Sequence, residues 1–191
     1  ANVVFPGTAP TPPVVNWTQL GLDIDGEASD DQSGASVSIS ADGQTVAIGA
    51  NLSDTTGNNS GHVRVYKYDV NKTTNVTDQN SADFGPVGWR RLGKDIDGEA
   101  ANDRSGYSVS LSSDGTIVAI KSPLNDGTTG VSTDDRGHVR VYKYDVNKTT
   151  NVTDQTSPDY GPVGWRRLGI DIDGEAGDAT NYARSTKDVS L

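Results

Sequence analysis

The chain lacks several features that usually define a functional class. It contains no cysteine and only two histidines, so the sequence shows neither a disulfide framework nor a cysteine-histidine zinc site. No apolar run approaches the ~18 residues of a membrane-spanning helix, and we therefore predict no membrane insertion. The net charge of −10, without a basic patch, argues against nucleic acid and anionic membranes as partners.

Apolar residues and methionine are also scarce. Hydrophobic residues make up 32% of the chain, below the usual ~45–50%, so thin two-layer packing is expected rather than one large core. Methionine is absent and the sequence begins at Ala1. We expect a processed chain that has lost a secretory signal, or an excerpt of a longer one. The predicted location is extracellular.

What the chain does contain is a copy of itself. Gly61–Ala100 and Gly137–Ala176 differ at only four of 40 positions, and a weaker copy begins at Trp17. We divide the chain into an N-terminal arm (1–16), repeat 1 (17–88), repeat 2 (89–164) and a partial repeat 3 (165–191). Tandem arrays of this kind usually form surfaces, scaffolds or polymers rather than one catalytic pocket, and no enzymatic activity is predicted.

Each repeat shows four candidate strands and no helical spacing. In repeat 1 they are 17–24, 35–40, 45–49 and 62–68, and Asp42-Gly43 provides a hairpin turn. In strand 62–68 we expect Val63 and Val65 to face one way and Arg64 and Tyr66 the other. The predicted fold is all-β, with tandem four-stranded antiparallel blades of the β-propeller type, two complete and one split.

The order of these motifs resembles a known repeat. Ser33–Val37, Asp42-Gly43, Val46–Ala50 and Gly61–Tyr66 resemble the FG-GAP repeat of integrin-α-type β-propellers. The W-x-x-L-G and D-I-D-G-E-A elements are similar to those of secreted microbial and algal surface proteins. In that family the blades often carry an Asp-rich calcium loop between strands. Here the loop has shrunk to Ser40–Gly43, so calcium binding is not carried over to it.

The predicted blades do not close into a ring. Val189-Ser190-Leu191 matches Val109-Ser110-Leu111, which places the C-terminus at the front of an unfinished blade. The N-terminal residues resemble the back of a blade. We expect the residues that would complete the split blade between copies of the chain, in a filament, to be Asn2, Val3, Val4, Phe5, Val189 and Leu191. The alternatives are closure within one molecule and membership of a longer repeat array.

The asparagines indicate N-linked glycans. Seven of the 13 begin an Asn-x-Ser/Thr motif, and we predict glycosylation at Asn16, Asn51, Asn58, Asn71, Asn75, Asn147 and Asn151. The paired motifs at 71/75 and 147/151 lie in a polar segment, 69–85 and its copy 145–161, that is typical of an exposed loop. The alternative is a Thr/Asn-rich loop in an organism that does not modify it.

Acidic residues recur in the motif D-I-D-G-E. Alternate positions on a strand would place its carboxylates on one face, where calcium could bind; the candidates are Asp23, Asp25, Glu27, Asp95, Asp97, Glu99, Asp171, Asp173 and Glu175. The alternative is a solvated strand edge whose charge discourages unwanted pairing.

Three other residue types recur once in each repeat. His62 and His138 each start a strand without a second ligand nearby, which favours a packed or surface role. The tryptophans, at 17, 89 and 165, are predicted to lie in the core between blades rather than on a sugar-binding surface. The arginine pairs Arg90-Arg91 and Arg166-Arg167 are expected to be exposed, or to face acidic strands of a neighbouring repeat.

These observations predict a structural subunit of an extracellular glycoprotein filament or surface coat. Its partners would be copies of itself, and copies would join head to tail by strand complementation. The alternative is an adhesion or ligand-binding module from an integrin-like propeller. Chelation, imaging and glycan removal would distinguish these possibilities.

Overall fold

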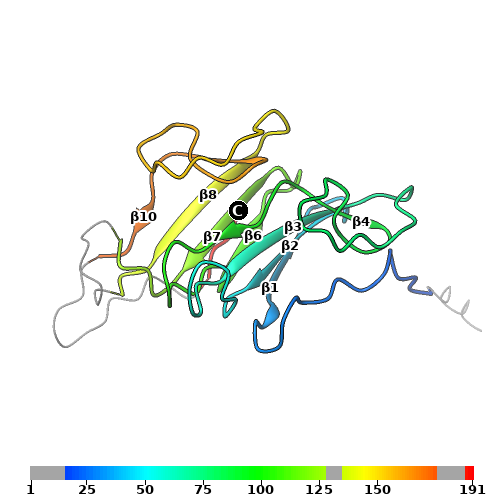
Figure 1. The fold of residues 1–191 in the computed structure, drawn as a ribbon, viewed down its shortest axis with the longest axis horizontal. Helices are drawn as coiled ribbons and strands as arrows, with labels where there is room; N and C mark the ends of the chain where they lie inside the picture. The colour runs from blue at the N-terminus through cyan, green and yellow to red at the C-terminus, as the bar shows by residue number, and fades with distance from the viewer. Residues whose placement is uncertain (1–15, 128–134, 176–187) are drawn as a thin grey trace, which may run out of the picture.

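A computed structural model describes residues 16–127, 135–175 and 188–191, in which ten strands form two antiparallel sheets (Figure 1). Sheet 1 contains β1 (Ser33–Ile39), β2 (Thr45–Ala50), β3 (His62–Tyr68), β4 (Trp89–Arg91) and β5 (Ile96–Asp97). Sheet 2 contains β6 (Ser108–Leu111), β7 (Ile117–Ser122), β8 (His138–Tyr144), β9 (Trp165–Arg167) and β10 (Ile172–Asp173). The all-β, blade-like fold is confirmed, although no ring closes within the described residues.

Short turns set the register of the hairpins. Asp42 accepts hydrogen bonds from the Ser40 hydroxyl at 2.6 Å and from the Gln44 amide at 2.9 Å. Gly43 follows with a φ of 70°, a conformation that glycine adopts without strain. The turn aligns Ile39 with Val46 across β1 and β2. Asp114-Gly115 repeats the turn between β6 and β7, where Asp114 bonds Ser112 and Thr116.

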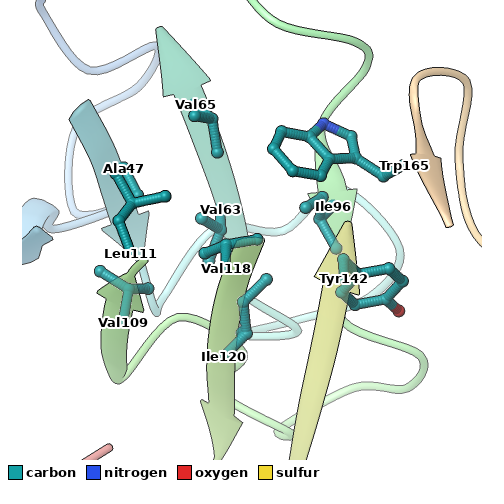
Figure 2. Packing of buried hydrophobic residues seen from close by; sticks show 10 residues of the cluster. All are labelled: Ala47, Val63, Val65, Ile96, Val109, Leu111, Val118, Ile120, Tyr142 and Trp165. Carbon is teal, nitrogen blue, oxygen red and sulfur yellow. The ribbon is translucent and has the colours of Figure 1, made fainter. Parts of the chain in front are cut away.

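The main core lies between the two sheets, as between neighbouring blades. Figure 2 shows Val63 and Val65 of β3 next to Val118 and Ile120 of β7, with the Trp165 ring beside them. A second cluster, on the other face of sheet 1, contains Val46, Tyr66 and Trp89. The predicted facing of strand 62–68 is therefore confirmed, because its valines and Tyr66 lie in opposite clusters.

The sheets are out of phase with the sequence repeats. The strand that begins at Trp89 pairs with β3 and so completes the sheet that begins at Ser33. Its counterpart, 17–24, was predicted as a strand but lies outside the strands that the structure describes. By analogy with Trp89, a strand at 17–24 would need to pair with a β3-like strand of a preceding blade, and the described residues contain no such strand. This segment packs instead on sheet 1, where the Leu22 amide donates to the Val87 carbonyl at 2.9 Å.

The C-terminal residues sit at the position of a blade's first strand. The Leu191 amide donates to the Ser110 hydroxyl at 2.9 Å, just as the Leu111 amide donates to Ser38 at 2.9 Å. The Val189 amide adds a bond of 3.1 Å to Ser108. Val189–Leu191 therefore occupies on sheet 2 the place that β6 occupies on sheet 1. The proposed donor strand, Asn2–Phe5, lies outside the described residues.

Candidate functional site

Each sheet receives the segment that precedes its first strand in the sequence, and this junction contains the buried arginines of the described residues. We call the contact of residues 20–27 with sheet 1 junction 1, and the contact of residues 92–99 with sheet 2 junction 2. At junction 1, Arg64 pairs with Glu27 at 2.5 Å and with Asp95 at 2.6 Å. Arg91 binds the other oxygen of Asp95 at 2.6 Å. One guanidinium therefore links carboxylates from two successive repeats.

Junction 2 has the same arrangement. Arg140 pairs with Glu99 at 2.6 Å and with Asp171, and Arg167 binds Asp171 at 2.8 Å. An aromatic ring covers the two arginines at each junction: Arg91 lies 4.5 Å from the Phe84 ring centre, and Arg167 lies 4.6 Å from that of Tyr160. Such cation–π contacts favour a charged guanidinium in a partly desolvated place. The network is a repeated structural element rather than a single centre.

The surroundings shift several pKa values. Burial would raise the pKa of Asp95, but the hydrogen bond and charge of Arg64 outweigh it and lower the pKa. Burial, followed by the charge of Asp95, raises the pKa of Asp97 to about 6. Burial, followed by the charge of Arg140, lowers the pKa of His138 to about 4. His138 is therefore neutral near pH 7, and Asp95 is ionised.

The structure groups the predicted calcium ligands differently from the sequence interpretation. The carboxylates brought together come from successive motifs, Glu27 with Asp95 and Glu99 with Asp171, rather than from one motif. Asp23, Asp25 and Glu175 are exposed. Oxygen and nitrogen atoms of Glu27, His62 and Asp95 do lie within 4.8 Å of one another, as do those of Glu99, His138 and Asp171. However, an arginine already binds both carboxylates in each group, and its charge opposes a metal ion there.

The other recurring residues divide into confirmed and corrected predictions. Trp89 and Trp165 are buried in the core as predicted, but Trp17 is 96% exposed because none of the described residues covers it. His62 and His138 are buried strand residues. The expected exposure of the arginine pairs is wrong for Arg91 and Arg167, whose side chains are 3% and 7% exposed and bind Asp95 and Asp171.

Most of the predicted glycosylation sites are accessible. The asparagine side chains that lie in exposed positions are Asn16, Asn58, Asn71, Asn75, Asn147 and Asn151. Asn51 is the exception, since it is buried at the end of β2 with 5% of its surface exposed. A folded chain cannot carry a glycan on that amide, and Asn51 is removed from the predicted acceptors.

Side chains that are buried between sheets 1 and 2 have counterparts that are exposed at the two ends of this pair of sheets. Val37 and Ile39 of β1 are 58% and 59% exposed, whereas their counterparts Val109 and Leu111 of β6 are 7% and 5% exposed. At the other end Ile172 is 62% exposed, while its counterpart Ile96 is 2% exposed. The same side chains are thus core in the middle of the array and surface at its ends.

A groove lies beside each junction. The groove at junction 1 has a volume of about 400 Å³ and lies between Asp25 and the loop residues Asn75, Gln79 and Phe84. The groove at junction 2, with about 340 Å³, lies between Asp97 and the loop residues Asn151, Gln155 and Tyr160. Polar and aromatic groups line both, as in sites for small polar ligands.

Sequence reasoning missed the arginine that links successive repeats. Arg64 interrupts the apolar strand His62–Tyr68, and Arg140 interrupts its copy. A charged residue inside a buried strand requires a partner, so this interruption was the available signal. Which carboxylate fulfils the role depends on the packing of one repeat against the next, which strand periodicity does not specify.

Comparison with known proteins agrees with the architecture. Residues 22–66 match the FG-GAP repeat family, and they span the junction 1 segment together with β1, β2 and most of β3. Comparison with curated proteins gave no match, and neither did comparison with solved structures. FG-GAP repeats are in general non-enzymatic and are typical of extracellular proteins. Among the described residues, no helix is long and apolar enough to cross a membrane.

Proposed function

We propose that this FG-GAP-type repeat protein is a structural subunit of an extracellular glycoprotein filament or surface coat. Copies of the chain join head to tail, so that the blade stack continues from one molecule to the next. Strand complementation at the joint would use Asn2–Phe5 of one copy and Val189–Leu191 of another. The observation that carries this proposal is the contrast in burial between Val109 and Leu111 inside the array and Val37 and Ile39 at its end.

The physical argument is one of equivalent surfaces. The interface between sheets 1 and 2 is held by apolar side chains, by serine–amide bonds and by the ion pair between Glu99, which follows β5, and Arg140 of β8. The end of sheet 1 presents the same strand sequence, and the end of sheet 2 presents Val189–Leu191 at the corresponding position. Apolar edges and unpaired strand margins favour association, and a head-to-tail contact that does not close on itself gives a filament.

Glycans fit this role as a coat on the outside of the stack. The exposed asparagines in the 69–85 and 145–161 loops lie away from the apolar core between the sheets. Sugars on these loops would hinder proteolysis and sideways aggregation without occupying the ends. We therefore include N-linked glycans in the proposal at the exposed asparagines away from the ends of the stack, which are Asn58, Asn71, Asn75, Asn147 and Asn151. Secretion follows from the same assignment.

The test is the assembly state of the purified chain. We expect concentration-dependent oligomers in sedimentation velocity and fibres in negative-stain images. Ile39→Asp should reduce assembly because it places a charge on a face that would become core, while the monomer keeps its stability because Ile39 is exposed. Val70→Asp, on a loop residue that is 73% exposed, is the control. Deletion of residues 1–13 tests the donated strand, and fibres unchanged by it would contradict strand complementation.

A second candidate is an adhesion module, which the two equivalent grooves favour. Their spacing along the array would allow a repetitive ligand, such as an oligosaccharide, to bind at two places. Calorimetric titration with neutral and acidic oligosaccharides, on the wild type and on Gln79→Ala, tests this candidate. Binding that weakens in the variant would support an adhesion role. Discrete monomers that bind no sugar would support neither function.

A further inference from the structure

The tryptophans form a ladder in which each one binds the repeat before it. The Trp89 indole N–H donates to the Leu20 carbonyl at 3.0 Å, and the Trp165 indole N–H donates to the Leu92 carbonyl at 2.9 Å. The acceptor belongs in both cases to the W-x-x-L-G motif of the preceding repeat. Backbone bonds accompany each rung, from Leu22 to Val87 and from Lys94 to Val163.

A glycine makes room for each indole. Gly21 and Gly93 have φ values of 67° and 65°, and a Cβ on either would lie 2.7–2.8 Å from the indole nitrogen above it. Gly169, the third member of the series, has nearly the same φ of 72°. A Cβ on Gly169 would meet nothing within 4 Å among the described residues. The third W-x-x-L-G motif thus has the shape of an indole-binding site and no indole on it.

The opposite end of the chain carries the complementary group. Trp17 is 96% exposed, whereas Trp89 and Trp165 are 8% and 0% exposed. Leu168 and Ile170, beside Gly169, are exposed as well. In the part of the chain that the structure describes, Trp17 therefore contacts no indole-binding site and the Leu168-Gly169 site holds no tryptophan, and the two lie at opposite ends of the same ladder.

We infer that Trp17 of one copy docks on Leu168-Gly169 of a second copy and donates its indole N–H to the Leu168 carbonyl. This inference rests on the proposed head-to-tail assembly and identifies the contact that forms the joint. Residues 17–18 of one copy then lie against residues 168–169 of the other copy, as Trp89 lies against Leu20 and Gly21 within the chain.

One sequence difference makes the contact between copies fit less closely than the two tryptophan contacts within the chain. The residue before the tryptophan is Gly88 or Gly164 inside the chain, with φ values of 84° and 85°. A Cβ at either position would lie 2.5 Å from the Cα of Gly21 or Gly93. At Trp17 this residue is Asn16, and its Cβ would press on Gly169 in the same way. Asparagine tolerates positive φ better than most residues, so Asn16 can adopt the backbone conformation of Gly88 and Gly164, but its Cβ requires the two backbones to move apart.

The same residue links assembly to modification. Asn16 is one of the predicted glycan acceptors, and a glycan there would lie in the joint. Docking and glycosylation of Asn16 therefore exclude each other, and chains within an assembly carry an unmodified Asn16. Protein produced without glycosylation is the appropriate material for testing the contact itself.

The experiment compares association of the unglycosylated chain with four variants by sedimentation velocity. We expect Trp17→Ala to weaken association at least about tenfold, as loss of a central interface tryptophan usually does. Val70→Ala, which removes an exposed apolar side chain elsewhere, should leave association unchanged. Asn16→Gly should strengthen it by restoring the internal Gly-Trp pair, and Thr18→Ala, which also removes the glycosylation motif, should not.

Tryptophan fluorescence gives a second measure of docking. Because the Trp17 indole is exposed, acrylamide should quench its fluorescence in the monomer. Quenching should decrease as the chain assembles and Trp17 becomes buried. The Trp17 contact would be overturned if Trp17→Ala assembled as strongly as the wild type, or if acrylamide quenching did not change on assembly. Either result would leave a filament role possible. Weaker association of Asn16→Gly would also overturn the Trp17 contact. A wild-type chain that stays monomeric at its highest soluble concentration would overturn both the joint and the proposed function.

Discussion

Arg64 and Glu27 lie 37 positions apart in the sequence and form an ion pair of 2.5 Å that fastens residues 20–27 to sheet 1. The Arg64 side chain is 7% exposed, and it also binds Asp95 on its own sheet. Arg140, Glu99 and Asp171 form the same triad one repeat later. The array is therefore held together by charge as well as by apolar packing, and each junction can be tested separately.

Removal of Arg64 should destabilise the chain more than removal of a surface arginine. Arg64→Leu leaves Asp95 with one arginine instead of two and Glu27 without its ion pair, and we expect a loss of about 2–4 kcal/mol in the free energy of unfolding. Arg90→Leu is the matched control, because Arg90 is 35% exposed and its pairs with Asp69 and Asp83 should contribute about 0–1 kcal/mol. Urea denaturation measures both. Equal losses would show that the junction triad has no special role.

Asp97 should make stability depend on pH in an unusual direction. Its folded pKa of about 6 lies above the ~3.9 of an unfolded aspartate, so the folded state binds its proton more tightly. The stabilisation from this proton is complete below pH ~3.9 and is lost as pH rises through 6. Asp97→Asn removes the effect, and we expect the variant to exceed the wild type by about 1–2 kcal/mol at pH 7 and to match it near pH 4.

The comparison with the variant is necessary because His138 acts in the opposite sense. Its folded pKa of about 4 lies below the ordinary value of 6.5, so its contribution is present above pH 6.5 and is lost as pH falls toward 4. The two effects partly cancel in the wild type. Denaturation curves of both proteins between pH 4 and 7 isolate Asp97, and a difference that stays constant with pH would contradict the assignment.

The sequence supported some levels of this structure better than others. Alternation along 62–68 predicted the strand and its two faces, because Val63 and Val65 differ clearly from Arg64 and Tyr66 in polarity. The Asp-Gly turns were likewise local signals. Pairing between repeats was not accessible in this way, since Arg64 and Asp95 meet only when the start of repeat 2 completes sheet 1.

Two errors had the same origin. Trp17 was predicted to be core by analogy with Trp89, but burial depends on a neighbouring blade that sequence similarity does not supply. Asn51 carries an acceptor motif as complete as that of Asn75, yet it follows directly after β2 and its side chain is buried. A repeated motif predicts local conformation, whereas exposure depends on what surrounds each copy.

Calcium removal should leave the fold intact. The acidic residues that gather at the junctions are bound by Arg64 and Arg91 or by Arg140 and Arg167, so their charges are balanced by the chain itself. We expect thermal unfolding in excess EDTA to give the same midpoint as unfolding in excess calcium. A midpoint that falls on chelation and recovers on adding calcium would revive the prediction for the D-I-D-G-E residues.

A pair of glycine variants separates backbone strain from the space that an indole requires. Gly93 and Gly169 share a left-handed φ, so alanine at either position should cost about 1 kcal/mol. At Gly93 the added Cβ would also lie 2.6 Å from the Val163 carbonyl and 2.8 Å from the fully buried Trp165 ring. Displacing that ring should cost about 1–3 kcal/mol more. Gly169→Ala in the monomer should therefore be clearly more stable than Gly93→Ala in thermal or urea denaturation. Because the strain is common to both variants, equal losses would mean that the indole at Trp165 yields without cost and that the glycine is not a specific indole-binding position.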